Sequence, residues 1–137
     1  MATSSIEAVI PCDIHRVWET LLAVERYTWR TDLSKTEVRG DRQFVEYTRE
    51  GIATVFTVTL VDPCRRWEFD LDNCNIKGHW IGTLTPTDRG TEITFTEHVT
   101  AKKFWMRPFV KRFLKRQQAQ FVLDLKRALC KDTARED

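Results

Sequence analysis

The sequence RWEFDLD, residues 66–72, alternates large apolar side chains with charged ones. Successive side chains of a β-strand point to opposite faces of a sheet, so this pattern predicts a strand with Trp67, Phe69 and Leu71 on a buried face. Segments rich in β-branched and aromatic residues, separated by turn signals, continue before and after it. We predict strands at residues 5–10, 34–39, 43–49, 53–61, 66–71, 77–85 and 92–101.

The connections between the last six predicted strands are short, as at Gly40-Asp41 and Asp62-Pro63. Such connections leave no room for a crossover helix, so neighbouring strands are expected to pair antiparallel. The alternation also gives the other strands an inner face. Besides the three residues above, the side chains expected to face inward are Phe56, Val58, Leu60, Trp80, Leu84, Ile93, Phe95 and Val99.

Helical periodicity precedes this β-rich region. Asp13 is a good N-cap for a helix from Ile14 to about Ala23, because apolar residues recur there at three- and four-residue spacing. A second short helical piece is expected at residues 24–28. Two short helices are therefore predicted between the first and second strands.

The longest predicted element is a helix that begins near Arg107, after a looser helical turn. Pro108 suits the first turn of a helix, where no N–H group is needed. Apolar residues then recur with helical spacing along the rest of the segment. The predicted inward stripe consists of Met106, Val110, Phe113, Gln117, Phe121, Leu125 and Leu129.

The composition is that of a folded domain, with 42% hydrophobic and 31% charged residues among 137. We expect one domain over residues 1–137. No apolar run approaches the roughly 20 residues of a membrane span, and the first 12 residues lack the pattern of a secretory signal. The sequence accordingly predicts a cytoplasmic protein.

A resemblance to a known superfamily is carried by five segments, which read PCDIHRVW (residues 11–18), DPCRRWEF (62–69), GHWIGTLTP (78–86), GTEIT (90–94) and LKRAL (125–129). They resemble the START-related helix-grip superfamily (SRPBCC), and within it the polyketide cyclase/dehydrase and lipid-transport-like subgroup. The resemblance implies an α+β helix-grip fold. In that fold a seven-stranded antiparallel sheet wraps around a long C-terminal helix, with two short helices between strands 1 and 2.

Members of this superfamily bind apolar molecules such as lipids, sterols, hormones and polyketides between helix and sheet, and some catalyse cyclisation or dehydration there. The resemblance therefore implies a largely apolar cavity with a few polar groups that orient a small hydrophobic ligand. The alternative is that the same aromatic residues fill a solid core. The candidate ligand-binding residues are Phe56, Val58, Trp67, Phe69, Trp80, Phe95, Phe113, Gln117 and Phe121.

Glu97 and Tyr47 are the candidate catalytic residues. Glu97 shares the strand phase of Phe95 and Val99, which points its carboxylate inward, where an unpaired charge is costly and the pKa should rise. Tyr47 shares the inward strand phase of Val45 and would bring a hydroxyl to the cavity mouth, and Arg49, farther along the same phase, would pair with an anionic ligand group. The alternatives are a bulge that exposes Glu97, and solvated positions for Tyr47 and Arg49.

Neither a metal nor another cofactor is expected. His15, His79 and His98 are isolated from one another and are interpreted as surface residues. The chain has no H-E-x-x-H motif, no glycine-rich phosphate loop and no G-x-S-x-G elbow. This pattern argues against a metal enzyme, a nucleotidyl enzyme and a serine hydrolase.

Residues 102–131 are strongly basic, because ten lysines and arginines are opposed only by Asp124. Four of these cations recur every four residues and form a stripe suited to weak contact with an anionic membrane. The alternative is a solvated helix face, balanced by the acidic remainder of the chain. Nucleic acid is not an expected partner, since no RNA-recognition motif or helix-turn-helix is present. The stripe consists of Lys103, Arg107, Lys111 and Lys115.

The sequence thus favours a binding or carrier protein over an enzyme, because the resemblance supplies a cavity while no catalytic constellation is evident. The expected ligand is a small hydrophobic molecule, such as a lipid, an aromatic or a polyketide-like compound. A cyclase or dehydratase that uses Glu97 and Tyr47 as acid/base groups is the first alternative. An interaction module that docks on anionic surfaces through the basic helix is the second.

Overall fold

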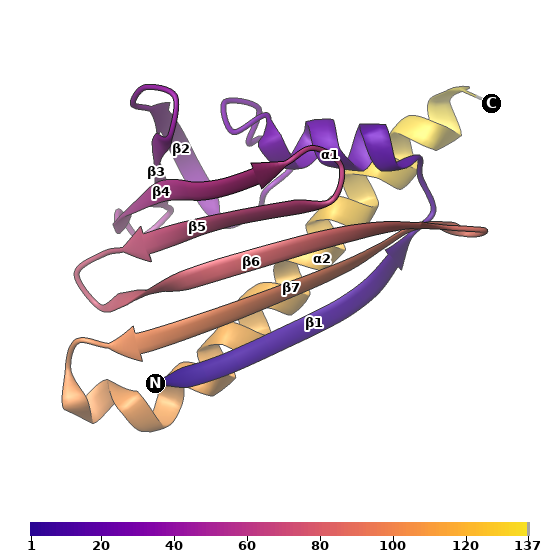
Figure 1. Cartoon of the computed structure of the whole chain (residues 1–137). Helices are drawn as coiled ribbons and strands as arrows, with labels where there is room; N and C mark the ends of the chain where they lie inside the picture. The colour runs from indigo at the N-terminus through magenta and orange to yellow at the C-terminus, as the bar shows by residue number, and fades with distance from the viewer. Residues whose placement is uncertain (137) are drawn as a thin grey trace.

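Seven strands form one antiparallel sheet in the order β1-β7-β6-β5-β4-β3-β2 (Figure 1). The structure is a computed structural model that describes the backbone of residues 1–136 and the side chains of residues 1–130. Over that range, the predicted α+β fold with its antiparallel sheet and long C-terminal helix is confirmed. The strands are β1 (Ala2–Ile10), β2 (Leu33–Val38), β3 (Gln43–Thr48), β4 (Ala53–Asp62), β5 (Arg66–Asp72), β6 (Ile76–Thr87) and β7 (Gly90–Ala101).

The strict alternation of β5 sets the inner face of the sheet. Trp67, Phe69 and Leu71 are buried, as predicted, and so are all five apolar residues predicted to face inward on β6 and β7. Leu60 on β4 is an exception, because it is 38% exposed. The pairing of β4 with β5 shifts register between Val58 and Leu60, and this irregularity breaks the alternation on which the prediction rested.

Helix α1 (Ile14–Leu22) begins at its predicted N-cap, where the carboxylate of Asp13 accepts a hydrogen bond from the backbone N–H of His15. The second short helix predicted at residues 24–28 is absent. The backbone forms turns there, with a hydrogen bond from the N–H of Arg26 to the carbonyl of Ala23. The chain between α1 and β2 therefore follows an irregular path.

Helix α2 (Arg107–Glu136) follows a single 3-10 turn, η1 (Phe104–Met106), and crosses the inner face of the sheet against β1 and β7 (Figure 1). Its predicted start and the looser turn before it are confirmed. Lys131 belongs to the predicted basic segment, but its side chain lies outside those described. Among the described residues, no helix is long and apolar enough to cross a bilayer.

The buried stripe of α2 differs from the prediction. It consists of Val110, Leu114, Gln118, Val122, Leu125 and Leu129. Phe113, in contrast, is 47% exposed, and Gln117 is exposed as well. The buried stripe instead contains Leu114 and Gln118, the residues that follow Phe113 and Gln117. The side-chain amide of Gln118 faces β1. There it accepts a hydrogen bond from the hydroxyl of Ser4 and donates one to the Ser4 carbonyl, at 2.8 and 3.0 Å.

Candidate functional site

A cavity of about 400 Å³ lies between the inner face of the sheet and α2, and it extends to the irregular segment after α1. Small-molecule sites in proteins typically measure roughly 300–1,000 Å³. Strands β3 to β7, the segment after α1, and η1 with α2 all contribute to the wall, which is rich in aromatic side chains. The space between helix and sheet is therefore large enough for a small ligand.

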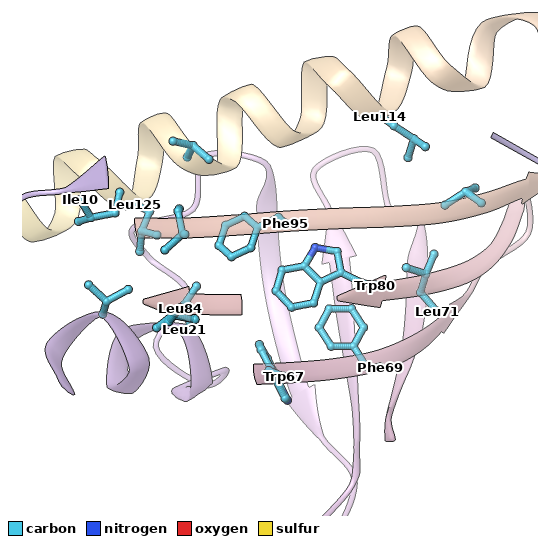
Figure 2. Packing of buried hydrophobic residues seen from close by; sticks show 14 of the residues in the cluster. Ile10, Leu21, Trp67, Phe69, Leu71, Trp80, Leu84, Phe95, Leu114 and Leu125 are labelled. Carbon is cyan, nitrogen blue, oxygen red and sulfur yellow. The ribbon is translucent and has the colours of Figure 1, made fainter. Parts of the chain in front are cut away.

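The aromatic wall is a continuous set of ring contacts. The rings of Phe69 and Trp80 are parallel, with centroids 4.6 Å apart, and the ring of Trp80 also lies 5.0 Å from that of Phe95. Figure 2 shows these rings gathered between the strands and α2. Gly82 makes room for them, because a Cβ atom at this position would lie 2.3 Å from the Cη2 atom of Trp80. A larger residue at position 82 would displace the indole.

Eight of the nine predicted ligand-binding residues line this cavity, although their contact with a ligand stays a prediction. Val58 does not line it: the β4 part of the wall ends at Phe56, and Val58 packs against the hydrophobic core instead. Phe113 and Gln117 are exposed and form part of the mouth. The eight lining residues are Phe56, Trp67, Phe69, Trp80, Phe95, Phe113, Gln117 and Phe121.

Arg30 places a buried cation in the cavity wall. Its guanidinium donates to both carboxylate oxygens of Asp32, at 2.9 and 3.0 Å, and to Oε2 of Glu46 at 3.4 Å. The ring of Phe121 lies 4.6 Å from its Cζ atom. Burial by itself lowers the pKa of Arg30, but Glu46 and Asp32 together raise it above its ordinary value. Arg30 is therefore a fixed charge whose hydrogen bonds are directed to protein carboxylates.

Glu46 and Glu97 add two carboxyl groups to the same wall. Burial raises the pKa of Glu46, an effect that Arg30 opposes. Burial also raises the pKa of Glu97, to about 7, with Arg30 lowering it and Glu46 raising it further. Within the described residues, the Glu97 carboxyl makes no hydrogen bond or ion pair. Near neutral pH it can therefore donate a hydrogen bond to a ligand or accept one.

The predicted inward orientation of Glu97 is confirmed, because the residue lines the cavity. The alternative of an exposing bulge is wrong. On one side Glu97 pairs with Ser4 of β1, and on the other with Trp80 of β6, in an unbroken register. Regular pairing keeps the alternation of β7 intact as far as Val99.

The predicted inner face of β3 is wrong. Phe44 stacks on Phe56 at 4.9 Å and fixes the phase of the strand, so Glu46 and Thr48 follow it into the cavity wall. Tyr47 consequently lies on the opposite face. The structure therefore separates Tyr47 from Glu97, and the two do not form a joint acid/base pair.

Tyr47 and Arg49 have partners outside the cavity. The hydroxyl of Tyr47 donates to Oε2 of Glu37 at 3.3 Å, and the ammonium of Lys35 lies 4.9 Å from its ring centroid. The guanidinium of Arg49 donates to the backbone carbonyl of Thr31 at 2.6 Å. Neither residue lines the cavity, so Arg49 is not placed to meet an anionic ligand group there.

The polar residues of the wall that sequence reasoning missed include two charged ones, Arg30 and Glu46. The sequence would have predicted an inward Glu46 if Phe44, rather than Val45, had been assigned to the inner face of this strand. Arg30 lies in an irregular segment that carries no periodic signal. Only the folded chain brings it beside β3.

Helix α2 holds the segment that carries Arg30. Asp124 is 1% exposed, and its Oδ2 atom accepts hydrogen bonds from the backbone N–H and the hydroxyl of Thr31, both at 2.9 Å. Gln120 donates to the other oxygen of Asp124 at 2.8 Å. Asp124, the only acidic residue within the basic residues 102–131, thus holds Thr31 and the neighbouring Arg30 next to the cavity.

The histidines lie away from the cavity wall. His79 is half-buried on the outer face of the sheet, with its ring nitrogens 2.8 Å from Glu68 and 2.7 Å from Asp70. Burial alone lowers the pKa of His79, but the hydrogen bonds to these two carboxylates raise it above its ordinary value. His15 is exposed and His98 is half-buried. Across the described side chains, no cluster of three or more His, Cys, Asp or Glu residues could hold a metal ion.

Comparison with known proteins adds a family to this geometry. A family model described as "Polyketide cyclase / dehydrase and lipid transport" matches residues 1–129. No curated protein matches the sequence. A START superfamily protein from Mycobacterium smegmatis has a similar structure, with a TM-score of 0.84 and 11% identity over 94% of this chain and 97% of that one.

Two further solved structures are similar. A protein from Mesorhizobium loti has a TM-score of 0.79 and 19% identity, over 95% of this chain and 98% of that one. DynU16, a protein of the dynemicin biosynthetic locus, has a TM-score of 0.73 and 20% identity, over 93% of this chain but only 46% of DynU16. At these identities the likeness establishes the fold alone.

Proposed function

Because the chain belongs to the polyketide cyclase/dehydrase and lipid transport family, we propose that it binds or carries a small hydrophobic molecule inside its cavity. The observation that carries this proposal is an aromatic cavity of about 400 Å³ with a carboxyl group in its wall, Glu97, that has no partner among the described residues. Such a site suits a molecule that is mostly apolar but has one polar group. A lipid, an aromatic compound or a polyketide-like compound fits this description.

The polar group of the ligand is expected to meet Glu97 rather than Arg30. The guanidinium of Arg30 already bonds Asp32 and Glu46, whereas the carboxyl of Glu97 has no bond to satisfy it. A hydroxyl, keto or amine group on the ligand would supply the missing hydrogen bond. The bond would be strong, since the surroundings are largely apolar.

Obstructing the cavity tests this proposal. Gln117 is exposed at the mouth, so Gln117→Trp should fold normally while its indole fills part of the opening. Ala119→Trp is the matched control, because Ala119 is exposed on the same helix and does not line the cavity. Binding of an apolar fluorescent probe such as ANS to the native protein is the measurement.

We expect Gln117→Trp to weaken probe binding and Ala119→Trp to leave it unchanged. Circular dichroism of both variants checks that the fold is kept. If the native protein bound no probe, or if both variants bound it as the parent does, the cavity would not be the binding site.

A cyclase or dehydratase remains the second candidate function, because a carboxyl whose pKa is about 7 suits general acid/base chemistry near neutral pH. Tyr47 has no part in this version, since it lies on the other face of β3. The two functions differ in their response to Glu97→Gln. A binding protein would keep most of its affinity for the ligand, whereas an enzyme would bind a polyketide-like substrate and fail to convert it.

A further inference from the structure

The cavity opens beside η1 and the first half of α2. Five of the residues that line it are exposed, and all but Arg26 lie on these two elements: Trp105, Phe109, Phe113 and Gln117. Residues that are both exposed and part of the wall mark the place where a cavity meets the surface. In Figure 1 this is the end of the molecule near the N-terminus and the start of α2.

Three exposed aromatic residues of this mouth, together with Phe104 beside them in the chain, are called the aromatic rim here. Phe104 is 78% exposed, Phe109 63%, Trp105 60% and Phe113 47%. Large apolar side chains gathered at this exposure mark a surface that contacts an apolar partner. The rim is thus distinct from the solid core, which lies deeper between α2 and the sheet.

Exposed cations lie along the same stretch of chain as the aromatic rim. Arg112 and Arg116 follow Phe109 and Phe113 by three residues, so they are their neighbours on the helix surface. No aspartate or glutamate occurs between residues 98 and 123. Six of the cations are exposed and form no ion pair among the described residues: Lys103, Arg107, Lys111, Arg112, Lys115 and Arg116.

We propose that the protein docks on anionic lipid bilayers through the aromatic rim, with Phe104, Trp105, Phe109 and Phe113 entering the interface and the adjacent Arg112 and Arg116 contacting anionic headgroups. Aromatic and basic side chains on one surface are the combination that binds such interfaces. The stripe predicted from the sequence, from Lys103 to Lys115, adds positive charge to the same end of the molecule, but its Lys111 and Lys115 lie on another side of α2 than Phe109 and Phe113. The structure adds the aromatic rings, the two arginines beside them and the cavity mouth.

Charge complementarity favours a bilayer over the other possible occupants. A second copy of the chain would bring two unpaired positive surfaces together, which costs energy. A single-stranded nucleic acid needs a basic groove that follows its backbone, whereas here the rings surround the opening of an apolar cavity. An anionic bilayer offers both negative charge and an apolar phase to the same surface.

Docking in this orientation would place the cavity mouth against the lipid. A hydrophobic ligand could then pass between bilayer and cavity without crossing water. This consequence rests on the proposed ligand-binding function, whereas the docking itself does not. Probe binding in solution and vesicle binding therefore test the two proposals separately.

Cosedimentation of the full chain with vesicles tests the docking. We expect binding to vesicles of phosphatidylcholine mixed with phosphatidylserine, and much less to phosphatidylcholine alone. Arg112→Glu with Arg116→Glu should weaken binding at least about tenfold, because two favourable charges near the surface are lost and reversed. Trp105→Ala with Phe109→Ala should weaken it through the lost apolar contact.

Two controls lie away from the rim. Arg89→Glu changes a cation in the turn between β6 and β7, and Leu123→Ala removes an exposed apolar side chain farther along α2. Both should bind vesicles as the parent does. Trp105→Phe keeps an apolar ring at the rim, so it should still cosediment while losing much of the fluorescence quenching by brominated lipids.

Failure to bind phosphatidylserine vesicles would overturn the docking proposal, as would equal losses in the rim variants and the controls. A dimer in solution that Trp105→Ala with Phe109→Ala dissociates, without vesicle binding, would assign the rim to self-association. Tight binding of a nucleic acid oligomer that displaces the vesicles would assign it to that partner instead.

Discussion

Buried charges lie in the wall of the cavity, and exposed aromatic rings lie at its mouth. Inside, Arg30 is satisfied by two carboxylates, while Glu97 has no partner in the described structure. At the mouth, Trp105 and Phe109 are each 60% or more exposed. Neither the Glu97 carboxyl nor the exposed rings stabilise the isolated chain, because an unpaired buried carboxyl and a solvent-exposed aromatic ring both cost free energy. This contrast is what we expect if a ligand pairs with Glu97 in the cavity and an apolar surface covers the rings at the mouth.

The largest effect is expected where an aromatic ring belongs to the solid part of the wall. Phe95 is 1% exposed and contacts the rings of Trp80 and Phe121. Phe95→Ala should lower the free energy of unfolding by about 3–5 kcal/mol, the usual cost of truncating a buried aromatic. Urea denaturation measures this. A loss below about 1 kcal/mol would mean that the interior is not packed as described.

Removing the central cation should cost almost as much. Arg30→Met leaves Asp32 and Glu46 without their hydrogen-bond donor. The cost should be about 2–3 kcal/mol, below that of a fully buried pair because the Asp32 side chain is 37% exposed. The loss should shrink at acidic pH, where Glu46, whose pKa burial raises, takes up a proton. Arg42→Met, at an exposed arginine, is the control and should have little effect. A loss that stayed constant with pH would contradict the electrostatic explanation.

Glu97→Gln should change how stability depends on pH. With a folded pKa of about 7, against an ordinary value of 4.5, the folded state keeps a proton that the unfolded chain has released. The stability of the parent should therefore fall as pH rises from about 4.5 to about 7. Glutamine does not ionise, so the variant should gain up to about 3 kcal/mol relative to the parent over that interval. Above it, the difference should stay constant.

Unfolding of both proteins at several pH values measures this effect. Glu92→Gln is the matched control, since Glu92 is exposed on the same strand. If the stability of Glu97→Gln depended on pH in the same way as that of the parent, the pKa of Glu97 would not be raised in the folded state.

The smallest effect is expected at the mouth. Phe113 has the same ring as Phe95 but is 47% exposed, so Phe113→Ala should lower the free energy of unfolding by less than about 1 kcal/mol. Thermal and urea unfolding measure the difference between the two variants. If truncation of Phe113 cost as much as truncation of Phe95, the rim would be part of the core and the contrast between the two ends would disappear.

Sequence alone predicted the inner faces of those strands in which apolar and polar residues alternate strictly. In β5, one phase holds Trp67, Phe69 and Leu71 and the other holds only charged residues, so the phase was clear. In β3, Phe44 and Val45 are adjacent and both buried, at 5% and 1% exposure. The two-residue alternation of a strand does not indicate which of these two side chains faces the cavity. The stack of Phe44 on Phe56 fixes which of the two faces inward. Phe56 belongs to β4, so the sequence of β3 alone does not reveal this contact.

The same ambiguity displaced the stripe of α2. Phe113 and Leu114 are adjacent and both apolar, yet Leu114 is fully buried while Phe113 faces the mouth. The deciding contact is between Gln118 and Ser4, which lie 114 positions apart in the chain. Arg30 was missed for a related reason, because its segment is held in place by Asp124 rather than by a periodic pattern. Long-range polar contacts therefore account for most of what could not be predicted.

Native mass spectrometry of the purified protein tests the central claim most directly. The protein would be sprayed from volatile buffer after purification without detergent, alone and after incubation with a mixture of lipids and aromatic compounds. We predict a mass shift that corresponds to one small apolar molecule, and its loss in Gln117→Trp but not in Ala119→Trp. A chain that stayed unliganded in every mixture, or that kept the same adduct in both variants, would contradict the assignment of the cavity as a binding site.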